Sequence, residues 1–149
     1  MNQMEKLTVQ SYEMIRVVGI YLQQTSDRDL QELLQQHLPN FLQCYNRLLE
    51  FSEGEELQVL LMQSLQAMLM VQEEQPPQGA DLVACSYLQD MQQMAAAYAK
   101  AAIEIANPGV RQFLENSFLV INRHAYEAWQ YVMKRGMTMP VPDACREAT

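Results

Sequence analysis

The tripeptide Asn107-Pro108-Gly109 joins two long segments in which apolar residues recur at helical spacing. Asparagine is a good N-cap, and proline suits the first position of a helix because its missing N–H would have no partner there. The tripeptide therefore ends one helix and begins the next without a loop. Two long helices joined so tightly must fold back on each other as an antiparallel hairpin.

A second tight break, TSDRD, divides the first half of the chain in the same way. Ser26 or Asp27 can cap the helix that follows it. Pro39 lies inside that helix, and we expect it to bend the helix instead of ending it, because the apolar stripe stays in phase beyond it. The periodicity as a whole predicts helices at about 5–24, 27–51, 55–73, 81–106 and 108–135.

The connection between the two hairpins is long. It runs through about 52–80 and contains an apolar segment of about 18 residues, which as a helix rises about 27 Å. Pro76-Pro77 then forbids helix, Asp81 can cap the next helix, and Gly136 can end the last one. A connection of this length can travel the whole bundle, as in ferritin-like proteins. We therefore expect an all-α, ferritin-like four-helix bundle of two antiparallel helical hairpins with a long, partly helical crossover.

Composition agrees with one helical domain. The chain has 149 residues, 49% of them hydrophobic, and only 5 glycines, which suits a single core and long elements. We expect a domain over 1–136 and an extended or mobile tail over 137–149, where the sequence shows no period.

Charge and hydropathy exclude several classes of partner. The net charge of -8, without a basic stripe, disfavours nucleic acid. No apolar run approaches the roughly 20 residues that a membrane span needs. The N-terminal segment lacks the charged-then-apolar order of a signal peptide, so we expect a protein made and kept in a cytosol.

The two histidines raise the question of a metal site. Each lies in the second helix of its hairpin, and with a crossover the rise per residue places His37 and His124 at nearly the same height. Glu13 and Asp90 fall within about a turn of that level. These four residues are the candidates for a metal site inside the bundle.

A ferritin-like di-metal centre needs a different pattern. It takes Glu-x-x-His from two helices and a carboxylate from each of the other two. Leu34 and Ile121 stand three residues before the two histidines, so apolar side chains replace both bridging carboxylates. We predict no metal and no cofactor, with the histidines hydrogen-bonded in or beside the core. A single metal held by His37, His124 and an acid is the alternative.

No other pattern in the sequence predicts catalysis. It contains neither a glycine-rich phosphate loop nor a nucleophile elbow. Cys44, Cys85 and Cys145 have neither paired nor metal-like spacing, and nothing positions a thiol against a histidine. We interpret them as small buried or exposed thiols, with a reactive Cys145 in the tail as the alternative. The sequence therefore predicts a protein that is not an enzyme.

A more specific signal is the stretch MQQMAAAYAKAAIEIANPGVRQFLENSFLVINRHAYEAWQYVMKRG. An Ala-rich helix leads to the Pro-containing break and Val110-Arg111, and a long helix follows with His124 in its middle and Met133-Lys134-Arg135-Gly136 at its end. This pattern resembles the Coat F family, the spore coat protein F-like proteins of endospore-forming bacteria. The resemblance covers about 82–142.

The resemblance implies a ferritin-like helical bundle with a structural or adhesive role in the proteinaceous spore coat. It also implies synthesis in the mother-cell cytoplasm, deposition in the coat, other coat proteins as partners, and no catalysis. We expect a homo-oligomer that forms through the segment that is apolar nearly all round, with Leu57, Leu61, Leu65 and Met68 as candidate interface residues. The alternative function is a ferritin-like metal-binding protein with a degenerate site inside the bundle.

Overall fold

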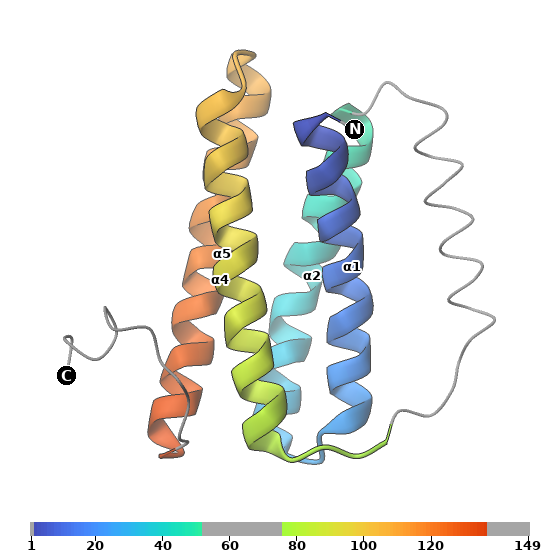
Figure 1. The fold of residues 1–149 in the computed structure, drawn as a ribbon, viewed down its shortest axis with the longest axis vertical. Coiled ribbons are helices and arrows are strands. Elements are labelled where there is room, and N and C mark those ends of the chain that lie inside the picture. The colour runs from blue at the N-terminus through green and yellow to red at the C-terminus, as the bar shows by residue number, and fades with distance from the viewer. Residues whose placement is uncertain (1, 52–75, 137–149) are drawn as a thin grey trace.

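Four helices account for almost all of residues 2–51 and 76–136, the part of the chain that this computed structural model describes (Figure 1). They are α1 (Gln3–Gln24), α2 (Arg28–Phe51), α4 (Ala80–Glu104) and α5 (Pro108–Lys134). These described residues contain no strand, so the predicted all-α class is confirmed. The predicted helix at 55–73 and the tail at 137–149 lie outside the described residues.

The two tight breaks are built on side-chain caps, as predicted. Asn107 is the N-cap of α5, and its side chain accepts a hydrogen bond of 3.0 Å from the N–H of Gly109. Asp27 does the same for α2 by accepting a bond of 3.0 Å from the N–H of Leu30. Each cap satisfies a backbone donor that the first helical turn leaves free. As a result α1 and α2 form one antiparallel hairpin, and α4 and α5 form the other (Figure 1).

The start of α4 differs from the prediction. Gly79 is its N-cap and makes no side-chain cap, whereas Asp81 lies inside the first turn. The predicted cap at Asp81 is therefore wrong. A tertiary contact explains the difference, because the N–H of Gln78 donates to the carbonyl of Gln24 over 3.0 Å and fixes the chain just before Ala80.

The same backbone bond sets the topology. It holds the start of α4 beside the end of α1, while α2 ends at the far end of the bundle (Figure 1). The end of α2 and the start of α4 therefore lie at opposite ends of the bundle. Within it, α1 packs against α2 and α4, and α5 packs against α4 and α2, so that each helix is antiparallel to both of its neighbours.

The core is apolar, with a polar layer inside it. Helices α4 and α5 pack most closely, and both bury small side chains; Ala84, Ala95, Ala101, Ala102, Ala125 and Ala128 are all buried. Among these apolar neighbours lie a few buried polar side chains, including Ser11, His37, Ser117 and His124. A buried polar group must be paired to be tolerated. These residues are therefore candidates for a role other than packing the core.

Candidate functional site

The two histidines stack on each other where α2 faces α5. Their ring centroids are 3.8 Å apart and the ring planes differ by 21°. His37 is 1% exposed and His124 is 6% exposed, so the pair is inside the core. The expectation that the two residues share one height is confirmed.

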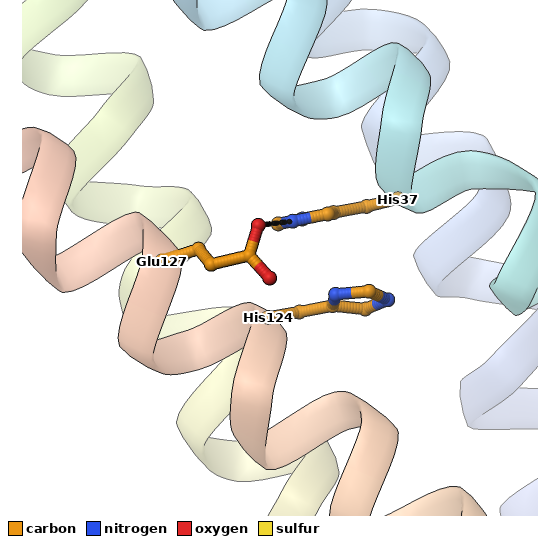
Figure 2. A group of neighbouring side chains, drawn as sticks. All are labelled: His37, His124 and Glu127. Carbon is orange, nitrogen blue, oxygen red and sulfur yellow. Dashed lines mark hydrogen bonds and ion pairs between the residues drawn. The ribbon is translucent and has the colours of Figure 1, made fainter.

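An acidic side chain completes the cluster. Glu127 lies one helical turn after His124, and its Oε2 is 3.1 Å from Nε2 of His37. Figure 2 shows the Glu127 carboxylate beside both rings, with a ring nitrogen of His124 on its side. Residues three apart on a helix share a face, which is why α5 presents the second histidine and the acid together.

Glu127 was missed in the sequence because the pattern sought was an acid three residues before each histidine. The acid here stands three residues after His124. The reverse pattern His-x-x-Glu was the signal that could have found it, since spacing in either direction keeps both side chains on one face.

Two further residues fix the orientation of the rings. The hydroxyl of Tyr87, itself fully buried, is 2.6 Å from Nδ1 of His37. The amide nitrogen of Asn40 is 3.0 Å from Nε2 of His124. Asn40 stands three residues after His37, so each histidine is bonded by the residue that follows the other histidine by one turn.

These partners assign the ring protons. A carboxylate can only accept, so Nε2–H of His37 donates to Glu127, and Nδ1 accepts from the Tyr87 hydroxyl. An amide N–H can only donate, so Nε2 of His124 accepts from Asn40 and its proton lies on Nδ1. That Nδ1 is buried and has no hydrogen-bond partner among the described residues.

Both rings are neutral near pH 7. Burial lowers the pKa of His37, against the opposing effect of the Glu127 hydrogen bond. Burial and the neighbouring His37 lower the pKa of His124 to about 4. A neutral imidazole is the form that can ligate a metal ion or accept a proton.

The acids predicted from the sequence lie elsewhere. Glu13 is exposed and pairs with Arg16 over 2.8 Å. Asp90 is half-buried, and it accepts a hydrogen bond of 2.5 Å from the Tyr21 hydroxyl. Both line a surface pocket of about 230 Å³ between α1 and α4, and neither belongs to the histidine cluster.

The positions that a ferritin-like di-metal centre reserves for acids are apolar core. Leu34 is 0% exposed and Ile121 is 1% exposed. Without carboxylates there, the described residues do not offer the bridging ligands that two metal ions need. The cluster can present ligands for one ion only.

The two cysteines that the structure describes, Cys44 and Cys85, play no part in this cluster. Cys44 is buried, and its thiol is 3.6 Å from the Ser117 hydroxyl. Burial raises the pKa of Cys44 and that of Cys85, which favours the protonated thiol in both. Cys145 lies outside the described residues, as do Leu57, Leu61, Leu65 and Met68.

The fold and the site define a helical-bundle protein whose core carries a paired-histidine cluster. The family model of the Coat F domain matches residues 82–142, which confirms the resemblance found in the sequence. The matched range holds Tyr87, His124 and Glu127, whereas His37 and Asn40 lie before it. The match suggests a spore coat protein.

Two further findings concern similar proteins and membrane-spanning helices. No curated protein and no solved structure matches the chain. Among the described residues, no helix combines the length and the apolar character that a membrane crossing requires.

Proposed function

We propose that this protein is a structural component of the bacterial endospore coat that acts by protein–protein association and not by catalysis. On this proposal it is made in the mother-cell cytoplasm and deposited on the spore, where other coat proteins are its partners. The observation that carries the proposal is the Coat F match over residues 82–142. That range covers α5 and all but the first two residues of α4, the two helices that pack most closely on each other.

The outer surface of α5 supports association. Leu119, Tyr126 and Met133 are 61%, 57% and 40% exposed. They are spaced by seven residues, so they lie along one side of the helix, and we call them the α5 stripe. Large apolar side chains that line up on a surface favour contact with another protein. The segment with Leu57, Leu61, Leu65 and Met68 remains a second proposed contact.

Fractionation of a sporulating culture of the source bacterium tests the coat role. We expect the protein in the mother-cell fraction first, and later in the material that detergent and reductant extract from purified spores. A cytoplasmic enzyme of the mother cell serves as the control, because it must be absent from washed spores. A chain that stays in the soluble mother-cell fraction, or that is equally abundant in growing cells, contradicts the proposal.

A further inference from the structure

The histidine cluster contains a buried polar atom that lacks a partner. Nδ1 of His124 makes no hydrogen bond within the described residues, although the residue is only 6% exposed. Its other ring nitrogen is engaged by Asn40. Leaving a buried donor or acceptor unpaired is costly, so such an atom points to a missing water or ion.

Suitable ligand atoms surround that nitrogen. One nitrogen from each ring and one carboxylate oxygen of Glu127 all lie within 4.8 Å of one another (Figure 2). For His37 this nitrogen is Nε2, which already contacts the carboxylate over 3.1 Å. For His124 it is Nδ1, because Nε2 bonds to Asn40.

We infer that His37, His124 and Glu127 bind one divalent transition-metal ion of the zinc class. Two imidazole nitrogens and one carboxylate oxygen are a ligand set that suits zinc. Three protein ligands leave the fourth tetrahedral position for water. The Glu127 side chain is 36% exposed, so solvent and the ion reach the cluster from that side. This metal site does not depend on the proposed coat role, so a test that contradicts one leaves the other unchanged.

Metal binding requires both rings to change tautomer. Nε2 of His37 loses its proton to solvent when it binds the ion, and Nδ1 takes one up, so the ring stays neutral. The new Nδ1–H then donates to the Tyr87 hydroxyl oxygen, which can accept as well as donate. His124 changes in the opposite direction, and its new Nε2–H donates to Asn40 once the amide turns its oxygen toward the ring.

The stacking of the rings also changes. A ligating nitrogen holds a metal ion in the plane of its ring, and two nearly parallel rings with centroids 3.8 Å apart cannot both do so. Side-chain torsions must therefore tilt the rings apart around the ion. Tyr87 and Asn40 act as positioning residues that hold the outer nitrogen of each ring.

Zinc titration of the untagged full chain tests the site by stoichiometry and by spectrum. We expect one Zn²⁺ per chain in competition with a chromophoric chelator. The chain has only 2 histidines, so a long-range ¹H–¹⁵N spectrum of the imidazoles reports these two rings alone. Zinc should move the proton of His37 from Nε2 to Nδ1, and the proton of His124 from Nδ1 to Nε2.

Matched variants on α5 separate this site from binding elsewhere. Glu127→Gln should weaken Zn²⁺ binding by at least about 10-fold, since loss of a direct ligand costs no less than loss of an outer partner. Glu115→Gln, on the same helix and paired with Arg111 at the surface, should bind as wild type does. Asn40→Asp should keep or tighten binding, because a carboxylate accepts from Nε2–H of His124.

Three results overturn the inference. Wild-type protein that takes up no equivalent of zinc shows that the cluster is structural only. Equal affinities of Glu127→Gln and Glu115→Gln, with both variants folded by circular dichroism, place the ion elsewhere on the chain. Histidine tautomers that do not change when zinc saturates the protein also place the ion elsewhere on the chain.

Discussion

At the scale of single residues, the buried cluster depends on side chains of neighbouring helices that form hydrogen bonds with the two imidazole rings. Glu127 bonds His37 and Asn40 bonds His124, so each helix orients the ring of the other. Tyr87 adds a hydroxyl from α4, which makes three helices responsible for two rings. The cluster is therefore a product of tertiary packing and not of one local motif.

Tyr87→Phe tests the contribution of that hydroxyl. The substitution keeps the ring but leaves Nδ1 of His37 buried without a donor, so we expect the free energy of unfolding to fall by about 1–3 kcal/mol. Tyr126→Phe is the control, since that side chain is 57% exposed and its loss of a hydroxyl should change stability by less than about 0.5 kcal/mol. Urea unfolding followed by circular dichroism measures both. Equal effects of the two substitutions contradict the role given to Tyr87.

The sequence predicts the heights of residues better than their partners. The shared level of His37 and His124 follows from a fixed rise per residue, and the structure confirms it. The partners depend on how far each helix is rotated about its axis, which a stripe of apolar residues leaves loosely defined. For that reason the sequence alone connects none of Tyr87, Glu127 and Asn40 with the histidines.

At the scale of elements, the helix starts that depend on one side chain were predictable. Asn107 and Asp27 cap their helices through bonds to residues within one turn, and the sequence contains all the parts of such a motif. The start of α4 depends instead on the bond between Gln78 and Gln24, which are far apart in the chain. No local pattern reports that contact, so Asp81 was wrongly expected to be the cap.

Asp27→Ala tests the cap and its ion pair together. Asp27 accepts from the N–H of Leu30 over 3.0 Å and pairs with Arg135 over 2.8 Å. We expect the substitution to lower the free energy of unfolding by about 1 kcal/mol at pH 7. Ser26→Ala, at the exposed neighbouring position, should change it by less than about 0.5 kcal/mol. A larger loss at Ser26 contradicts the assignment of the cap.

The effect of Asp27→Ala should depend on pH with a definite sign. The backbone N–H of Leu30 and the nearby Arg135 hold the pKa of Asp27 below its ordinary value of 3.8. The folded state therefore favours the ionised carboxyl, and its contribution is present above pH 3.8 and is lost as the pH falls through the folded pKa. Urea unfolding at pH 7, 5 and 3 should show a constant difference between wild type and variant, then a smaller one at pH 3. A difference that grows toward pH 3 contradicts this sign.

At the scale of the whole molecule, the length of the central connection was the informative feature. The sequence places nearly thirty residues between the hairpins, and the structure shows that α2 ends and α4 begins at opposite ends of the bundle. The directions of the helices follow from the length of this connection. A short loop would start α4 beside the end of α2 and make these two helices antiparallel. The all-α class was equally predictable from periodicity and from the few turn residues. The likeness to ferritin-like proteins stays a prediction.

The proposed function depends on association, and sedimentation velocity of the purified protein measures its self-association directly. We expect wild-type protein to form oligomers as its concentration rises. Leu119→Glu with Tyr126→Glu puts two charges on the α5 stripe and should weaken that association, while the helical circular dichroism signal stays unchanged. Gln36→Glu with Gln43→Glu is the matched control, because it adds the same charge at the same spacing on exposed positions of α2.

The result that decides the matter is the behaviour of wild type against these two double variants. A concentration-dependent oligomer that persists in the α2 control and dissociates in the α5 variant supports assembly through the α5 stripe. An oligomer that persists in both variants moves the contact away from the α5 stripe. Wild-type protein that remains a monomer at every concentration contradicts self-association as the basis of its function.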